Sequence, residues 1–216
     1  MKPKHQRIQM VERQLAARDI SDPLVLSAMG RIQREKFVSA DYRSQAYHDG
    51  PLPIGYRQTI SQPYIVALMT QALRLKGGEN VLEIGTGSGY AAAVLAEIAG
   101  KVTTIEFISE LAQQAERLLS DLGYDNISVI HGDGTLGYSP NAPYDAIVVT
   151  AGGPEVPESL KQQLKTGGRL VIPVGATTSM QSLLRVTRED KNNFSHEDLC
   201  GVRFVPLVGE EGWPVE

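Results

Sequence analysis

The sequence has 216 residues, of which 42% are hydrophobic and 21% charged, and this composition is ordinary for a soluble globular protein. A chain of this length fits one sizeable domain, with room for a small appendage. Its formal net charge of -4 argues against an obligate nucleic-acid-binding protein, because such proteins usually carry a basic surface. The single cysteine, Cys200, excludes an internal disulfide and a zinc site built from a cysteine cluster.

Targeting and membrane-spanning segments are not expected. The amino-terminal stretch MKPKHQRIQMVERQLAARDI is charged throughout and lacks the apolar core of a signal peptide. No run approaches the roughly 20 apolar residues that a membrane span needs. The residues His5, His131 and His196 lie far apart in the sequence, so a metal site is not expected either. We therefore predict a cytoplasmic protein without a membrane anchor or a bound metal ion.

The segment up to residue 78 combines helices with a long loop. Apolar residues at helical spacing predict an amphipathic helix over residues 5–19, and Asp22 marks a typical start for a second helix, LVLSAMGRI. The residues expected on the apolar side of the first helix are Ile8, Val11, Leu15 and Ala16. Residues 37–62 have no sustained period, and their tyrosines favour a functional loop over disorder. A third helix is predicted to start at Pro63 and to end at the glycine pair before residue 79.

After residue 78, short apolar strands alternate with helices. The expected strands are NVLEIG, KVTTIEF, NISVIHGD, YDAIVVTA and GRLVIPVG, and the expected helices are residues 90–99, 109–122 and about 155–165. Strands rich in Val and Ile that are separated by helices predict a parallel sheet covered on both faces. The segments MQSLLRVTRED and LCGVRFVPLVG, with the polar turn KNNFSHED between them, are expected to add antiparallel strands at one edge.

These elements predict the fold class and the organisation of the chain. We expect an α/β fold with a doubly wound, mostly parallel seven-stranded sheet and an added amino-terminal helical segment. That segment and the loop occupy 1–78, and the sheet with its carboxyl-terminal antiparallel strands occupies 79–216. Both parts are expected to form one compact domain.

A glycine-rich turn, EIGTGSGY, follows the first strand of the predicted sheet. Glycine at Gly85, Gly87 and Gly89 allows a ligand to approach the backbone and allows positive φ angles. A dinucleotide-binding turn would read G-x-G-x-x-G, whereas here Tyr90 follows Gly89 and the spacing is G-x-G-x-G. The pattern therefore argues against a nicotinamide dinucleotide, although a short glycine motif on its own can be purely structural.

Acidic residues occur at three successive strand ends. Glu106 ends the second strand, where a carboxylate can accept hydrogen bonds from both hydroxyls of a ribose. A carboxylate at Glu83 would repel a pyrophosphate but would suit the sulfonium and ammonium groups of S-adenosylmethionine. Asp133, in HGDGT, is placed to accept from an adenine amino group. Each acid alone could stabilise a turn or face solvent. Together with the glycines they favour a methyl donor.

Several segments, taken in order, resemble the protein-L-isoaspartate O-methyltransferases. These segments are TISQPYIVALM, VLEIGTGSGYAAAVLA, HGDGTLGY, YDAIVVTAG, GGRLVIPVG and VRFVPLVGEEGW, and the resemblance runs from about Gln6 to Trp213. The T-I-S-x-P element is specific to that family, whereas E-x-G-x-G-x-G is shared by many methyltransferases. The resemblance implies methyl transfer from S-adenosylmethionine to the α-carboxyl of L-isoaspartyl residues, and less well D-aspartyl residues, in damaged proteins and peptides. The products are S-adenosylhomocysteine and an ester that collapses to a succinimide, which starts repair.

The resemblance also implies roles for individual residues. The family's active-site serine falls on Ser61, with the hydroxyl of Thr59 beside it in TIS. The implied cofactor-binding residues are Glu83, Gly85, Thr86, Gly87, Ser88, Gly89, Glu106, Phe107, Asp133 and Gly134. Phe107 replaces an arginine that is common in the family, and it is expected to pack against the adenine. The segment VRFVPLVG matches the part that lines the peptide site, and family members are usually monomers.

The expected chemistry needs orientation more than activation. A carboxylate is already ionised at neutral pH, so Ser61 is expected to position the acceptor and not to act as a nucleophile. Three alternatives remain. The first is a methyltransferase that acts on another substrate, such as RNA, a small molecule or a different protein group. The second is a nicotinamide-dependent oxidoreductase, and the third is a binding module without catalysis. The acidic balance and the TIS loop count against the first alternative, and Tyr90 counts against the second. The third would require a degraded cofactor site.

Overall fold

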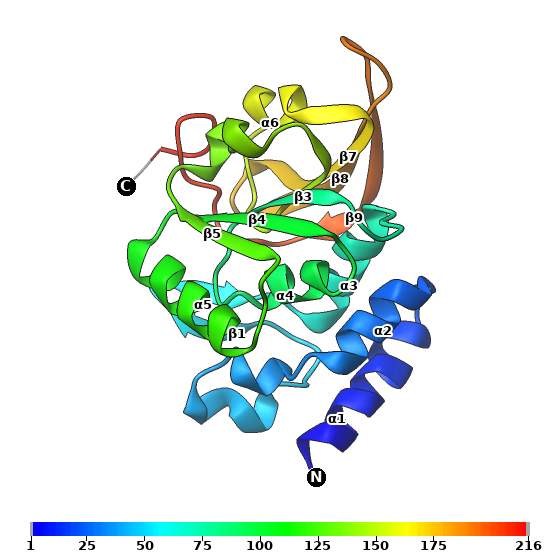
Figure 1. The fold of residues 1–216 in the computed structure, drawn as a ribbon, viewed down its shortest axis with the longest axis vertical. Helices are drawn as coiled ribbons and strands as arrows, with labels where there is room; N and C mark the ends of the chain where they lie inside the picture. The colour runs from blue at the N-terminus through cyan, green and yellow to red at the C-terminus, as the bar shows by residue number, and fades with distance from the viewer. Residues whose placement is uncertain (1, 215–216) are drawn as a thin grey trace.

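The computed structural model describes residues 2–214 and is built around a seven-stranded sheet with helices on both faces (Figure 1). Its strands are β3 (Asn80–Ile84), β4 (Lys101–Glu106), β5 (Ile127–His131), β6 (Tyr144–Val149), β7 (Leu164–Thr177), β8 (Met180–Arg188) and β9 (Phe194–Val202). They lie in the order β5-β4-β3-β6-β7-β8-β9. Strands β3 to β7 pair in parallel, whereas β8 and β9 are antiparallel. The predicted doubly wound, mostly parallel sheet is confirmed.

Both faces of the sheet are buried because successive side chains of each strand point to opposite sides. In β3 and β6, Val81 and Val148 join the hydrophobic cluster beneath the amino-terminal helices. Their neighbours Leu82 and Ile147 join a second cluster on the opposite face. This double burial explains why the strands read as nearly continuous apolar runs in the sequence.

Helices cover the two faces unequally. The helices of the core are α3 (Pro63–Ala72), α4 (Tyr90–Ala96), α5 (Ser109–Asp121) and α6 (Glu158–Gln162), with single turns η4 (Gly134–Leu136) and η5 (Ser139–Asn141). In Figure 1, α3, α4 and α5 lie on the same side of the sheet as the amino-terminal helices, and α6 lies on the other side. Three of these helices are shorter than predicted, and α4 ends at Ala96 instead of residue 99. Helix α3 ends at Ala72, before Gly77, because Arg74 has a φ of 53°. Helix α6 is short because Pro157 precedes it and β7 begins at Leu164.

The amino-terminal helix is present, but its buried side differs from prediction. Helix α1 (Pro3–Gln9) continues as the π-helical segment η1 (Met10–Ala16). Met10 and Leu15 are buried, whereas Ile8 is 43% exposed and Ala16 is exposed. The π-helical hydrogen bonds span one more residue than those of an α-helix, so the side chains rotate away from the regular spacing. Helix α2 (Pro23–Arg31) begins as predicted, and Asp22 accepts from the Leu24 amide at 2.8 Å.

The long loop contains structure that the sequence did not predict. The turn η2 (Arg34–Lys36) precedes it, and the loop itself holds the turn η3 (Ala40–Gln45) and a hairpin of β1 (Leu52–Gly55) and β2 (Gln58–Ile60). The turn of the hairpin is formed by Tyr56 and Arg57, which both have positive φ angles, 51° and 58°. Asn-Gly or Asp-Gly is the usual sequence signal for such a turn, and it is absent here.

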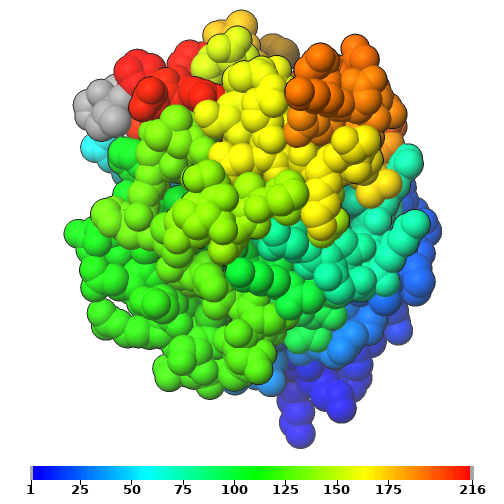
Figure 2. Space-filling model, turned by 45° about the horizontal axis from the view of Figure 1, so that its top comes forward, coloured from blue at the N-terminus to red at the C-terminus, as the bar shows by residue number. Residues whose placement is uncertain are grey.

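The carboxyl-terminal segment returns over the ends of the parallel strands. Strand β9 begins at Phe194, earlier than predicted, because the Asp190 side chain closes a tight turn by accepting from the amides of Asn192 and Asn193. Beyond β9 the chain is not a regular strand, but Gly152 donates to Val205 at 2.8 Å. Figure 2 shows this red segment against chain from the middle of the sequence. None of the helices within residues 2–214 has the length and apolar character needed to span a membrane.

Candidate active site

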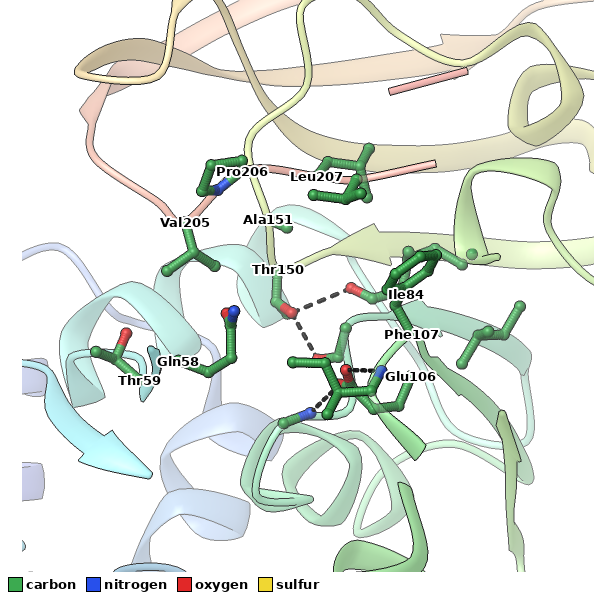
Figure 3. A pocket seen from close by; sticks show the side chains of 16 residues that line it. Gln58, Thr59, Ile84, Glu106, Phe107, Thr150, Ala151, Val205, Pro206 and Leu207 are labelled. Carbon is green, nitrogen blue, oxygen red and sulfur yellow. Dashed lines mark hydrogen bonds between the residues drawn. The ribbon is translucent and has the colours of Figure 1, made fainter. Parts of the chain in front are cut away.

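A cavity lies at the carboxyl ends of β3, β4 and β6, where the strand order of the sheet reverses (Figure 3). Ligands of open α/β sheets bind at such a reversal. We call this the strand-tip cavity; its lining residues are Gln58, Thr59, Ile84, Gly85, Gly87, Ile105, Glu106, Phe107, Ile108, Gly134, Thr150, Ala151, Val205, Pro206, Leu207 and Val208. The structure therefore brings together residues from the TIS loop, the glycine turn and the carboxyl-terminal segment.

The glycine turn after β3 requires its glycines for conformation and for space. Gly85, Gly87 and Gly89 have φ angles of 93°, 52° and 86°, in the region that other residues rarely adopt. A Cβ on Gly85 would lie 2.5 Å from Thr150 Oγ1. That hydroxyl donates to the Gly85 carbonyl at 2.7 Å and fastens the turn to the end of β6 (Figure 3). Thr150 was missed by the sequence analysis, although it is the polar residue that ends the apolar run YDAIVV.

Replacing Gly85 with alanine is expected to destabilise the protein by about 1–2 kcal/mol more than replacing Gly123 with alanine. Both glycines have similar positive φ angles, 93° and 83°, so both substitutions strain the backbone. Only the Gly85 variant also forces a Cβ against Thr150, because nothing lies within 4 Å of a Cβ at Gly123. Urea-induced unfolding of the two variants measures the difference, and equal losses would contradict the steric argument.

Glu106 ends β4 and faces the strand-tip cavity. Its carboxylate accepts from the Gly87 amide at 2.8 Å and from the Ile108 amide at 2.9 Å (Figure 3). A carboxylate has about four acceptor sites, so both oxygens can still accept from a ligand. Phe107 beside it is 43% exposed and lines the same cavity. The two residues thus offer an anionic acceptor and an apolar ring next to each other.

Glu83 lies behind the glycine turn and not in the cavity wall. Its side chain is fully buried, and Oε2 accepts from Thr104 Oγ1 at 2.6 Å. Burial raises the pKa of Glu83 to about 8; the Thr104 hydrogen bond opposes this rise and the nearby Glu106 carboxylate adds to it. The Glu83 carboxyl is therefore mostly protonated at neutral pH. Any effect of Glu83 on a ligand must act through the residues that separate them.

Asp133 and Gly134 have different positions relative to the cavity. Gly134 lines it, and a Cβ there would lie 2.4 Å from Ile84 Cγ2. Asp133 does not line it; its carboxylate accepts from the Thr135 hydroxyl at 2.7 Å and from the Glu210 amide at 2.8 Å. Asp133 thereby holds the carboxyl-terminal segment over the strand ends. Contact with an adenine amino group would use its remaining acceptor capacity.

Two further cavities adjoin the first. The loop cavity is lined by Pro51, Thr59, Ser61, Gln62, Ile65, Thr150, Val202, Arg203, Phe204 and Val205. The small turn cavity is lined by Thr59, Ile60, Ser61, Val66, Gly85, Thr86, Gly87, Ser88, Tyr90, Ala91 and Thr150. Thr59 borders all three cavities, and Ser61 borders the last two. Gly89 lines none of the three, and a Cβ there would lie 3.2 Å from Leu119 of α5.

The strand-tip and loop cavities share part of one wall. Thr59, Thr150 and Val205 border both. Thr59 was predicted from the sequence, but Thr150 and Val205 reach this wall from β6 and from the carboxyl-terminal segment. The resemblance had assigned the segment of Val205, VRFVPLVG, to the peptide site, whereas Thr150 was not predicted because it lies far from TIS in the sequence. Within residues 2–214, no group of three or more His, Cys, Asp or Glu side chains is arranged to hold a metal ion.

A doubly wound sheet of seven strands, with a glycine turn after β3 and a carboxylate at the end of β4, defines the class of Rossmann-like S-adenosylmethionine-dependent methyltransferases. Within this class, the sequence model of the family described as Protein-L-isoaspartate(D-aspartate) O-methyltransferase (PCMT) matches residues 5–212. The chain belongs to this family.

Individual relatives agree with this assignment. Protein-L-isoaspartate O-methyltransferase 1 of Rhodopseudomonas palustris (strain HaA2) is 60% identical over 208 residues, which are 96% of this chain and 85% of the relative. Protein-L-isoaspartate O-methyltransferase 2 of Pelobacter propionicus is 58% identical, over 94% of this chain and 91% of the relative. A solved protein-L-isoaspartate O-methyltransferase structure aligns with a TM-score of 0.87 and 31% identity, covering 95% of this chain and 67% of that one. A Plasmodium falciparum structure in complex with S-adenosyl-L-homocysteine aligns with a TM-score of 0.79 and 25% identity, covering 94% of this chain and 98% of that one.

Proposed function

We propose that the strand-tip cavity binds S-adenosylmethionine and that the loop cavity binds the acceptor carboxyl, so that the methyl group passes across their shared wall. The reaction is that of the family: methyl transfer from S-adenosylmethionine to isoaspartyl residues of damaged proteins, the first step of repair. The observation that carries the proposal is the shared wall of Thr59, Thr150 and Val205. Ligands that fill the two cavities would meet at these residues.

The lining of the strand-tip cavity suits this methyl donor. Glu106 is the one charged side chain among the described residues that line it, and its carboxylate keeps acceptor sites for the ribose hydroxyls. The lining contains no Lys or Arg that could neutralise a pyrophosphate. The positive φ angles of Gly85 and Gly87 let the ligand lie directly on the backbone. When bound, S-adenosylmethionine supplies a methyl group activated by its sulfonium.

The loop cavity supplies positioning groups and no strong base. Ser61 and Thr59 contribute hydroxyls, and Gln62 contributes an amide. The acceptor carboxylate is already a nucleophile at neutral pH, so the task of these groups is to aim one of its oxygens at the methyl carbon. That oxygen forms the new bond, the carbon–sulfur bond breaks, and its electron pair returns to sulfur. Neither step needs a proton from the enzyme.

The substrate assignment is tested with two peptides that differ only in the linkage at one aspartate. We expect the purified protein to transfer a radiolabelled methyl group to the isoaspartyl peptide and not to its normal aspartyl twin. A D-aspartyl version of the same peptide measures how far that substrate is used. Equal labelling of the isoaspartyl and aspartyl peptides would contradict the proposed substrate.

Replacing Ser61 with alanine is expected to lower kcat about tenfold, because loss of one orienting hydrogen bond costs about 1.4 kcal/mol in the transition state. The Kd for S-adenosylmethionine should stay close to that of the wild type, because the Ser61 hydroxyl is assigned to the acceptor carboxylate and Ser61 does not line the strand-tip cavity, which holds the nucleoside. Steady-state kinetics and calorimetry measure the two quantities, with the exposed Ser179→Ala as a control. Loss of cofactor binding in the Ser61 variant would refute the positioning role.

We also propose that the protein acts in the cytoplasm as a monomer that does not bind nucleic acid. The net charge of -4 supports the absence of nucleic acid, and the single cysteine is compatible with a reducing compartment. The helical part before residue 79 and the core after it are proposed to fold together, because Leu15 and Val94 belong to one hydrophobic cluster. Light scattering and a single unfolding transition test the monomer and the joint folding.

A further inference from the structure

A chain of three buried polar side chains connects the interior of the sheet with the glycine turn. Thr104 Oγ1, in the middle of β4, lies 2.6 Å from Glu83 Oε2 and 2.6 Å from Thr86 Oγ1. Glu83 and Thr104 are fully buried, and Thr86 is 3% exposed. Thr86 alone of the three lines the turn cavity, next to Gly87 and Ser61. The chain therefore leads from a buried carboxyl to the surface of a ligand cavity.

The direction of these hydrogen bonds follows from the number of protons. A hydroxyl has one proton, and when Glu83 is ionised the Thr104 proton is donated to its carboxylate. Thr104 must then accept from Thr86, whose own proton points inward. The Thr86 oxygen is left with lone pairs to offer on the cavity side, and an oxygen of this kind favours a cationic donor.

We propose that Thr104 is a positioning residue that orients the Thr86 hydroxyl as an acceptor for the ammonium group of the methyl donor. This inference rests on the proposed cofactor site. The ammonium lies at the amino-acid end of the ligand, and the turn cavity is the part of the site that adjoins both the glycine turn and Ser61. A buried acid can in this way favour a cation that it does not touch.

The unusual state of Glu83 fits this arrangement. Its Oε1 atom is buried and has no hydrogen-bond partner among the described residues, so Thr104 provides its main polar contact. The raised pKa of Glu83, caused first by burial, keeps the carboxyl mostly protonated when no ligand is near. A bound ammonium lowers that pKa and stabilises the ionised form, which in turn fixes the direction of both hydroxyls.

Neighbouring threonines on β4 provide a matched test. Thr103 is as buried as Thr104, but its hydroxyl accepts from Asn141 Nδ2 at 2.9 Å and is not part of the hydrogen-bonded series that leads to the glycine turn. Calorimetry would compare wild type, Thr104→Val, Thr104→Ser and Thr103→Val with two ligands. S-adenosylhomocysteine carries the ammonium, and 5′-methylthioadenosine has the same nucleoside without the amino-acid part.

We expect Thr104→Val to weaken S-adenosylhomocysteine binding about tenfold, the usual effect of one hydrogen bond to a charged group. Thr104→Ser and Thr103→Val should stay within about twofold of wild type, and 5′-methylthioadenosine should bind all four proteins alike. Thr86→Val should reproduce the Thr104→Val pattern, and it keeps the test available if Thr104→Val does not fold.

Three binding results would contradict the inference, and they can be told apart. Unchanged S-adenosylhomocysteine binding in Thr104→Val would refute the positioning role. Equal losses for both ligands would show a general disturbance of the turn and would also refute it. Failure of the wild-type protein to bind either ligand would instead refute the proposed cofactor site, on which this inference depends.

Discussion

The Glu106→Gln variant is expected to bind S-adenosylmethionine about 30-fold more weakly than the wild type, a loss of about 2 kcal/mol. The carboxylate already accepts from the amides of Gly87 and Ile108, and the ribose hydroxyls would use its remaining acceptor sites. Glutamine has one oxygen in place of two and no charge, so the amide hydrogen bonds and the ribose hydrogen bonds would compete for the same atom. Isothermal titration calorimetry measures the change in Kd.

Glu110→Gln is the matched control for this loss of charge. Glu110 lies nearby, in the first turn of α5, but it is exposed and does not line the strand-tip cavity. Its replacement should leave the Kd within about twofold of wild type, because an exposed charge contributes little. If the two variants bound the cofactor equally well, Glu106 would not be the ribose-binding residue.

The Glu83→Gln variant is expected to gain stability relative to the wild type as the pH rises. The pKa of Glu83 is raised to about 8 in the folded protein, whereas the unfolded chain titrates near the ordinary value of 4.5. Between these two values the unfolded state has lost its proton and the folded state has kept it, so wild-type stability falls with rising pH. Glutamine does not titrate and removes this dependence.

The size of this effect is open to direct measurement. The difference in unfolding free energy between Glu83→Gln and wild type should shift in favour of the variant by about 3 kcal/mol between pH 5 and pH 7.5. Other titrating groups are shared by both proteins and cancel in the difference. Urea-induced unfolding at several pH values provides the measurement, and parallel pH profiles for the two proteins would refute the raised pKa.

Local patterns in the sequence were sufficient for the sheet and for the turn that follows β3. Strands such as β3 and β6 are buried on both faces, so their apolar runs stand out, and the positive φ angles of Gly85 and Gly87 leave a clear glycine signal. The hairpin of β1 and β2 left no such signal, because Tyr56 and Arg57 form its turn in place of glycine or asparagine.

The parts of the site that escaped prediction depend on tertiary contacts. The resemblance assigned the segment of Val205 to the peptide site, but the contact that places it there, a hydrogen bond from Gly152 across 53 residues of chain, has no signal in the local sequence pattern. Asp133 was predicted as a ligand contact, but in the structure it does not line the strand-tip cavity, and its carboxylate accepts from the Glu210 amide. The sequence analysis took Glu83 as an acid suited to a cationic cofactor, but the sequence could not show that its side chain is buried behind the glycine turn.

A crystal structure of the protein with S-adenosylhomocysteine tests most directly how the two cavities are used. We expect both ribose hydroxyls within hydrogen-bonding distance of the Glu106 carboxylate, and the sulfur atom directed at the wall formed by Thr59 and Thr150. A ligand bound outside the strand-tip cavity, or a sulfur atom directed away from Ser61, would contradict the account.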